Sequence, residues 1–544
     1  MGLKKSIKNV TFRDNYRNTV ANQKYISMKK VLNFAAVSSL ILFLTSCERD
    51  RSPVTAWEYN NPKNGGFEVG QYIEQETGPG LLLIEGGTFT MGRTEQDITY
   101  DWNSIPRRVT TSSFYIDQTE VRNLDYLEYL YWTGNVFAPN YPEIVKNALP
   151  DTLVWRERLA YNEPYVEYYL RHPAYKNYPV VGVNWLQASA FCAWRTDRVN
   201  EFILIREGII NHTPLPTETD YFNTDQYLAG KWTGSVITPI SSMHPNGGDR
   251  LVRMEDGIFL PRYRLPTEAE WEFAAFSLIG NTIGDRIMER RIYSWNGSGV
   301  RNPDEEFIGQ MMANYQRGRG DLMGTAGKLN DAGDITTPVY SYWPNDYGVY
   351  NMSGNVSEWV MDVYRPLSPE DKADFRSFRG NVFKTQKKDE DGIMINTDSV
   401  LYDADSNIVS IPGMVLWRDV SIRVPADNLD ERRNYKYADN INYLDGDNAS
   451  QAEALSGASW SETFDPAIYG RPESAGMYEY GKTSMINDKA RVIKGGSWRD
   501  RAYWMAPGTR RYLDQRQSTA WLGFRCAMTR VGSPIGLGPD GKAE

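Results

Sequence analysis

Histidine and cysteine, two residue types that often carry out catalysis, are sparse and scattered in this 544-residue chain, with three of each. Its three histidines are His172, His212 and His244, and no two of them are four residues apart, the spacing that places two imidazoles on one helix face. A metal centre built from several histidines is therefore not expected. No phosphate-binding loop or glycine-rich dinucleotide fingerprint follows a predicted strand, which argues against nucleotide chemistry.

The first of the three cysteines, Cys47, ends a segment typical of a bacterial lipoprotein signal. An apolar stretch at 31–44 follows Met28-Lys29-Lys30 and leads into Leu44-Thr45-Ser46-Cys47. This stretch is shorter than the roughly 20 residues that a membrane-spanning helix needs, and its basic start and small-residue end are those of a secretory signal. The last four residues resemble a lipobox, so we expect Cys47 to carry the lipid anchor. The alternative is an ordinary cleaved signal with a chance cysteine.

This interpretation divides the N-terminal region into three parts. We expect residues 28–46 to be the signal peptide and residues 1–27 to be an upstream extension, with Met28 rather than Met1 as the true start. Residues 47–79 are polar and rich in turn-forming residues, which predicts a tether after the lipidated cysteine.

The other two cysteines, Cys192 and Cys526, are an even number in an oxidising compartment. One disulfide and two separate buried thiols are both compatible with the count. The net charge of −9 argues against nucleic acid as a partner, because phosphate binding needs a basic face.

Short strand and helix patterns alternate from about residue 80 to 531, and a Gly- and Pro-rich tail at 532–544 follows. Strands are predicted at 81–84 and 113–116, and a helix after Asn123, where Leu124, Leu127 and Tyr131 recur at helical spacing. A second helix pattern follows Asn184-Trp185. Thr267 and Glu270 form a capping box, which predicts another helix start.

Two long, polar insertions interrupt this pattern, at about 201–261 and 363–490. In the second, Asp403, Asp405 and Asn407 have the spacing that opens a calcium loop, but the glycine and glutamate that complete such a loop are missing. A turn between two strands is the favoured interpretation.

In order, these segments resemble the formylglycine-generating-enzyme, or sulfatase-modifying-factor, family. The matching runs lie at 87–92, 119–123, 179–185, 263–272, 345–359, 494–498 and 522–527. The resemblance implies an α+β domain related to C-type lectins, with little regular secondary structure and here with two long insertions. It also implies that Cys192 pairs with Cys526.

The resemblance further implies calcium as a cofactor. One site would use Asn351, Gly354, Val356 and Glu358, mixing side-chain and backbone oxygens as calcium prefers. The alternative is that Asn351 and Glu358 only stabilise the turn by hydrogen bonds. A second site would use Asn314, Tyr315, Asp331 and Gly333.

The chain departs from the family where the chemistry takes place. The family's enzymes oxidise a substrate cysteine with two copper-binding cysteines shortly after the Gly-Gly-Ser run. Here these positions hold Asp500 and Met505. A carboxylate is a hard ligand and a thioether has no proton to lose, so neither replaces a thiolate. We therefore expect no copper and no oxidase activity.

Among non-catalytic members, the lipobox, the run at 57–67 and the two insertions most resemble the lipoproteins of the gliding motility and type IX secretion apparatus. This resemblance implies an outer-membrane anchor, a periplasmic body and protein partners in that apparatus. Two alternatives remain. One is an enzyme of different chemistry that uses Asp500 with Arg499, Arg501, Arg510 or Arg511, and the other is a surface-exposed module that binds glycans or peptides.

Overall fold

The computed structural model describes residues 51–70, 74–93, 98, 100, 103–158, 160–277, 291–317, 333–364, 384–403, 406–419 and 489–532. The chain forms two compact units, residues 1–70 with 240–250, and residues 71–239 with 251–544. The predicted signal, Cys47 and the tail from 533 onward lie outside the described residues. Among the described residues, no helix is both long and apolar enough to cross a membrane.

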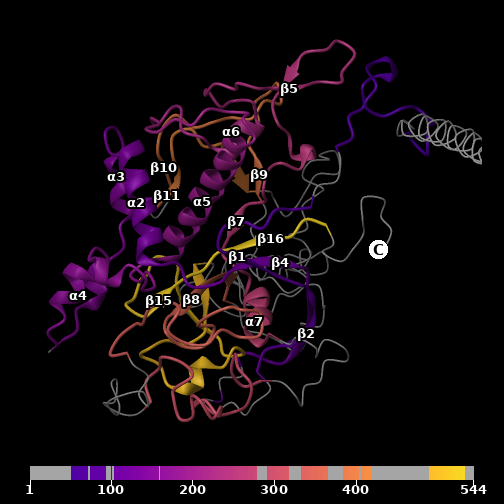
Figure 1. Cartoon of the computed structure of the whole chain (residues 1–544). Helices are drawn as coiled ribbons and strands as arrows, with labels where there is room; N and C mark the ends of the chain where they lie inside the picture. Colours follow the sequence, from indigo (N-terminus) through magenta and orange to yellow (C-terminus); the bar gives the residue numbers. More distant parts are fainter. Residues whose placement is uncertain are drawn as a thin grey trace, which may run out of the picture. The chain divides into compact units, whose positions relative to one another are not determined.

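Two small four-stranded sheets organise the larger unit (Figure 1). The first is antiparallel and has the order β1 (Leu81–Ile84), β4 (Phe114–Asp117), β16 (Ala527–Thr529), β7 (Tyr263–Arg264). The second has the order β14 (Arg511–Asp514), β13 (Ala490–Lys494), β8 (Ser357–Val363), β15 (Leu522–Gly523), and its last pair is parallel. A separate hairpin joins β2 (Gly87–Met91) to β3 (Arg107–Thr111). The strands predicted at 81–84 and 113–116 are therefore present.

Six helices are described, namely α2 (Asn123–Phe137), α3 (Pro142–Ala148), α4 (Glu163–Tyr168), α5 (Trp185–Arg206), α6 (Thr224–Leu228) and α7 (Glu268–Phe276). The capping box predicted from Thr267 and Glu270 is confirmed, since the Thr267 hydroxyl accepts from the Glu270 backbone N–H and the Glu270 carboxylate accepts from that of Thr267. All residues of α7 are buried. This short helix packs against β2, β3 and β8. Short 3-10 turns lie at Pro62–Asn64, Thr152–Trp155, Pro173–Tyr175, Met254–Asp256 and Ala502–Met505.

The α2 helix exists as predicted, but only part of its predicted apolar face is buried, with Leu127 packed against the core. Leu124 and Tyr131 are exposed, whereas Tyr126 and Tyr129 are buried. The reason is an aromatic cluster in which the ring of Tyr126 stacks on Phe191 of α5 at 5.7 Å. Large flat rings bury more apolar area than leucines, so they determine the orientation of this helix.

The described parts of both insertions contain short antiparallel pairs. In addition to α6, the first insertion contains β5 (Ile240–Ser241), which pairs with β6 (Asp249–Arg250). In the second insertion β9 (Lys384–Gln386) pairs with β12 (Trp417–Asp419), and β10 (Leu401–Tyr402) pairs with β11 (Ile408–Ser410). Asp403 lies in the turn between β10 and β11, where its carboxylate accepts from the backbone and side chain of Asn407. This geometry agrees with the turn interpretation; Asp405 lies outside the described residues.

The smaller unit joins the predicted tether to the first insertion. The Glu68 carboxylate accepts hydrogen bonds from the Met243 backbone at 2.7 Å, from the Ser242 hydroxyl at 3.1 Å and from Arg250 at 2.7 Å. These bonds lower the pKa of Glu68, the Met243 bond most of all. The predicted tether thus contains local structure over 51–70.

Candidate functional site

The segment after β13 holds Asp500 and Met505, the two positions that the resemblance aligns with the cysteines of the family's enzymes. Gly495 and Gly496 both have positive φ, +92° and +68°. A side chain at Gly496 would place its Cβ 2.8 Å from the carbonyl of Trp504, so only glycine fits there. The Gly-Gly turn therefore lets residues 497–505 fold back closely on the strand end.

Asp500 is held in an ion pair. Its two carboxylate oxygens accept hydrogen bonds from Arg511 at 2.7 and 2.6 Å, and one also accepts from the Ser497 hydroxyl at 2.6 Å. The Asp500 and Arg511 side chains are only 15% and 21% exposed. The guanidinium of Arg511 also lies 4.6 Å from the ring of Trp504 and 5.2 Å from that of Trp521. The Asp500 carboxylate thus serves to neutralise a largely buried arginine.

Met505 occupies the other cysteine position and is completely buried. It belongs to an apolar cluster with Tyr293, Met311, Ala313 and Tyr315. Its backbone carbonyl accepts a hydrogen bond from the Ser353 hydroxyl at 2.9 Å. A thioether in such surroundings fills space, as methionine does in protein cores.

The arginines assigned to an alternative enzyme do not gather around Asp500. Arg510 is buried and donates to Glu268 at 2.7 Å. Arg499 pairs with Glu157 at 2.9 Å, and Arg501 donates to the carbonyl of Arg317. Within the described structure, Arg511 is the member of the predicted set that forms an ion pair with Asp500, and it binds both carboxylate oxygens.

The first predicted calcium loop is built around a buried ion pair. Both oxygens of Glu358 accept from Arg525 at 2.6 Å, and one also accepts from the Trp271 indole at 2.8 Å. The amide nitrogen of Asn351 donates to Glu120 and to the carbonyl of Val339, both at 2.9 Å. Since protein donors already hold the Glu358 carboxylate, the side chains as arranged do not fit calcium, which would have to displace Arg525.

The remaining members of that loop set its shape. Asn351 and Gly354 have φ of +53° and +92°, and Val356 is completely buried. Within the described part of the chain, no three His, Cys, Asp or Glu side chains converge where a metal ion could sit.

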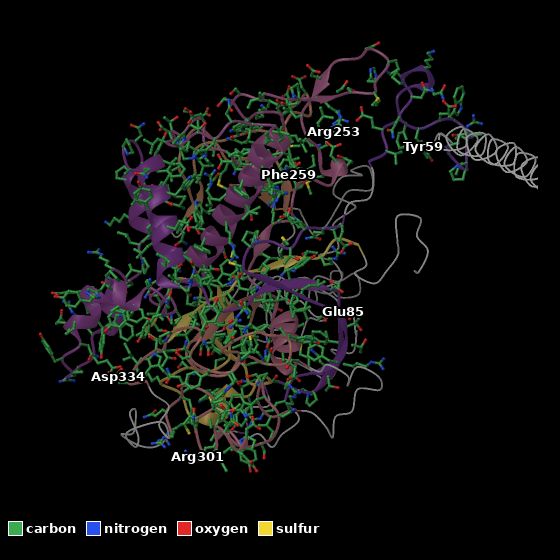
Figure 2. All side chains as sticks on the ribbon, viewed as in Figure 1. Tyr59, Glu85, Arg253, Phe259, Arg301 and Asp334 are labelled. Carbon is green, nitrogen blue, oxygen red and sulfur yellow. The ribbon has the colours of Figure 1, made fainter. Side chains whose placement is uncertain are left out.

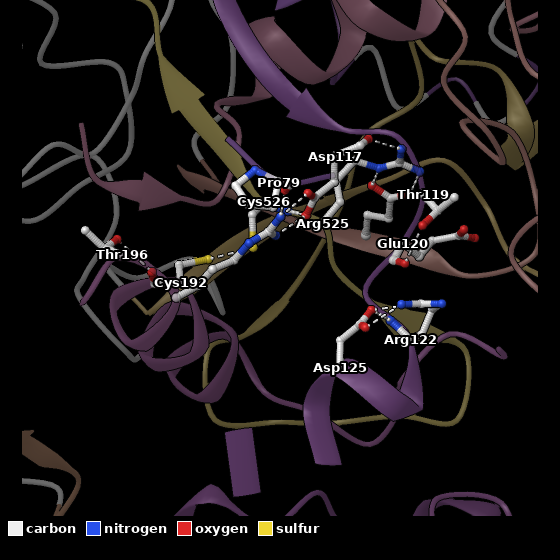
Figure 3. Close-up of polar contacts among 12 residues, drawn as sticks. Pro79, Asp117, Thr119, Glu120, Arg122, Asp125, Cys192, Thr196, Arg525 and Cys526 are labelled. Atoms are coloured by element: carbon white, nitrogen blue, oxygen red, sulfur yellow. Dashed lines mark hydrogen bonds and ion pairs between the residues drawn. The ribbon is translucent and has the colours of Figure 1, made fainter. Parts of the chain in front are cut away.

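Glu120 is a buried acid for which the sequence suggested no role. Its carboxylate accepts from the amides of Asn351 and Asn355, both at 2.9 Å (Figure 3 shows Glu120 near Arg525). Burial raises the pKa of Glu120 to about 7, with the neighbouring Glu358 also raising it and Arg525 opposing the shift. The sequence showed only that an acidic residue lies within the matching run at 119–123. Its burial depends on Asn351 and Asn355, which lie more than 200 residues further along the chain.

The second predicted calcium loop is described only in part. Asn314 donates from its amide to the carbonyl of Ile335 at 2.8 Å, and a Cβ on Gly333 would lie 3.0 Å from that amide nitrogen. Asn314 and Gly333 are therefore close together. Tyr315 belongs to the Met505 cluster. Asp331 lies outside the described residues.

Cys192 on α5 and Cys526 beside β16 are adjacent and buried, with their sulfurs 3.4 Å apart (Figure 3). Burial, together with the nearby Cys192, raises the pKa of the Cys526 thiol well above its ordinary value. The backbone N–H of Cys526 donates to Asp117, which also pairs with Arg195. The fold thus brings the predicted pair together as two thiols, and their oxidation stays a prediction.

Comparison with known proteins identifies the relatives of this chain. Residues 67–399 match the family described as "Sulfatase-modifying factor enzyme 1-like domain". The chain is 26% identical to the formylglycine-generating enzyme of Mus musculus over 305 residues, 52% of this chain and 58% of that enzyme. It is 25% identical to the mouse "Inactive C-alpha-formylglycine-generating enzyme 2" over 328 residues, 56% of this chain and 73% of that protein.

The chain therefore spans little more than half of the mouse enzyme. A solved structure, PvdO from Pseudomonas aeruginosa, is similar at 15% identity and a TM-score of 0.38, covering 82% of this chain and 93% of that one. The family contains both catalytic and inactive members. On the extent of the family match, this α+β chain belongs to the sulfatase-modifying factor enzyme 1-like family, with the fold of the formylglycine-generating enzymes.

Proposed function

We propose that this chain is a non-catalytic lipoprotein that serves as a structural component of the gliding motility and type IX secretion machinery. In this proposal Cys47 carries the lipid, the outer membrane holds the anchor and the folded body lies in the periplasm. Its partners are protein components of that apparatus. In this proposal the chain corresponds to the gliding motility lipoprotein GldJ, with the sister lipoprotein GldK as the alternative and as an expected member of the same complexes.

The observation that carries the non-catalytic part is the state of the two cysteine positions. Asp500 neutralises Arg511, and Met505 is completely buried in an apolar cluster. Neither side chain offers the soft, ionisable sulfur that copper(I) chemistry needs. The existence of inactive relatives supports the same conclusion.

A gene deletion tests the biological role. Loss of the gene should abolish surface spreading and protein secretion together, and Asp500→Asn supplied in its place should restore both, because a stable fold is all that the proposal requires. Deletion cells that still spread and secrete would contradict the scaffold role. An Asp500→Asn protein that accumulates normally without restoring either process would instead support an enzyme of different chemistry.

A surface-exposed binding module is the second candidate, and an aromatic pocket in the larger unit favours it. Protease treatment of intact cells separates the two candidates. A periplasmic scaffold should survive the treatment, whereas a surface-exposed module should lose its folded body.

Calcium binding by the second loop, which includes Asn314 and Gly333, stays a separate proposal. Calorimetric titration of the chelator-treated protein with calcium tests it. If Arg525 holds the Glu358 carboxylate as the geometry indicates, the first loop will take up no calcium.

A further inference from the structure

A cavity of about 540 Å³ lies in the larger unit, and its wall residue Met311 also belongs to the apolar cluster around Met505. Its walls come from the α4 region, from the loop at 307–311 and from the loop at 333–343. Its size is typical of a ligand site. Six of its fifteen lining residues are aromatic, namely Tyr165, Tyr175, Tyr178, Phe307, Tyr342 and Trp343.

The rings of this pocket are fixed by contacts with one another. Tyr175 and Tyr178 meet edge to face at 5.1 Å, and Phe307 meets Trp343 in the same way at 5.3 Å. Rings held in this way lose little freedom when a ligand binds, which favours affinity.

The pocket wall carries one carboxylate, that of Asp334. Asp334, labelled in Figure 2, is exposed and accepts a hydrogen bond from the Tyr165 hydroxyl at 3.0 Å. Among the described residues, no Lys or Arg forms an ion pair with it. Arg156, just before α4, is already paired with Glu163.

The tyrosine beside this acid stays neutral at physiological pH. Burial raises the pKa of Tyr165 to about 12, and the Asp334 carboxylate adds to the shift. The pocket therefore combines several neutral aromatic rings with one carboxylate that no Lys or Arg of the described residues neutralises. Such a combination attracts an organic cation through the ring faces and the carboxylate together.

We propose that this pocket binds an arginine or lysine side chain presented by a partner protein. The inference rests on the proposed scaffold role, which requires protein partners, and it gives one of them a place to dock. A glycan is less well matched. The hydroxyls of Thr336 and Thr337 in the wall are already hydrogen-bonded to Tyr169 and Asn355, which leaves fewer groups for sugar hydroxyls.

Fluorescence anisotropy on the purified full chain tests the proposal, with fluorescein-labelled octa-arginine and octa-lysine as probes. Asp334→Asn removes the charge but still accepts from Tyr165, and it should weaken binding by about tenfold; Trp343→Ala should weaken it by about fivefold. The matched control is Glu167→Gln, an exposed acid of α4 outside the pocket wall, which should leave binding within about twofold of wild type. Circular dichroism of each variant confirms folding.

Equal losses in Asp334→Asn and Glu167→Gln would show diffuse attraction to an acidic protein and would overturn the proposal. A glycan site would be indicated if calorimetry showed that the protein binds the neutral oligosaccharide chitohexaose, that Trp343→Ala abolishes this binding, and that no basic peptide binds. That result would also overturn the proposal. The gene deletion tests the scaffold role independently of this binding assay. If secretion depends on the gene but the purified protein binds no basic peptide, the docking proposal is wrong and the scaffold role still stands.

Discussion

Replacing Asp500 by asparagine separates a structural role for this acid from a chemical one. The substitution keeps the shape and the ability to accept from Ser497, but it removes the negative charge that faces Arg511. Arg511 would keep its hydrogen bond to Ser357 and its place between two tryptophan rings, with no anion to neutralise it. The expected consequence is a less stable protein.

The size of the effect follows from burial. Exposed ion pairs contribute about 0.2–1 kcal/mol, whereas removing one partner of a fully buried pair costs about 3–5 kcal/mol. At 15% and 21% exposure, the Asp500–Arg511 pair lies between these limits and nearer the buried one. We expect Asp500→Asn to lower the free energy of unfolding by about 2 kcal/mol.

Urea unfolding followed by circular dichroism measures this difference from the midpoint and the slope. The matched control is Asp514→Asn, because Asp514 and Arg516 are 3.7 Å apart with side chains 32% and 39% exposed. Its unfolding curve should overlay that of the wild type. If Asp500→Asn also overlays the wild type, the ion pair stabilises nothing, and the argument that Asp500 is retained for structure is refuted.

Three further predictions concern the buried interior. Glu358→Gln leaves Arg525 unpaired in a fully buried site, so unfolding free energy should fall by about 3–5 kcal/mol, measured by urea unfolding; a change below about 1 kcal/mol would contradict the buried ion pair. The pKa of Glu120 is about 7 in the folded state against an ordinary 4.5, so the folded state keeps the proton of Glu120 to a higher pH than the unfolded state. The stabilisation from this proton should therefore be complete below pH 4.5, and the free energy of unfolding should fall by up to about 3 kcal/mol as the pH rises through 7. The urea midpoint of the wild type should be lower at pH 8 than at pH 5, and that of Glu120→Gln should not show this difference. An equal change of midpoint with pH in the two proteins would refute the prediction. Finally, non-reducing peptide mapping of protein from its native compartment should recover Cys192 joined to Cys526, and reductant should lower the urea midpoint of the wild type but not of a double alanine variant. Separate thiol peptides would contradict this pairing.

Features that depend on neighbouring residues were predictable from the sequence. The Thr267–Glu270 capping box fixes the start of α7 by hydrogen bonds three residues apart, so a short sequence window contains all the information. The strand at 81–84 and the helix after Asn184 follow from local apolar patterns in the same way.

Features that depend on distant partners were not predictable in detail. Glu120 is buried because Asn351 and Asn355 reach it from more than 200 residues away. The exposure of Leu124 and Tyr131 on α2 was not predicted, because Tyr126 packs on Phe191 of another helix and so sets the orientation of α2. The family resemblance placed Asp500 at a cysteine position, but the sequence left several arginines as partners, and the folded chain brings Arg511 to it.

The most direct test of the non-catalytic account is an assay of the purified protein itself. The chain is loaded with copper(I) and incubated with oxygen and a cysteine-containing peptide substrate of the formylglycine-generating enzymes, with an active family member as the positive control. Mass spectrometry then follows the conversion of the cysteine to formylglycine. Because Asp500 and Met505 provide no thiolate, we expect the peptide to be recovered unchanged while the control converts it. Conversion by the wild-type chain above the rate of free copper would contradict the account.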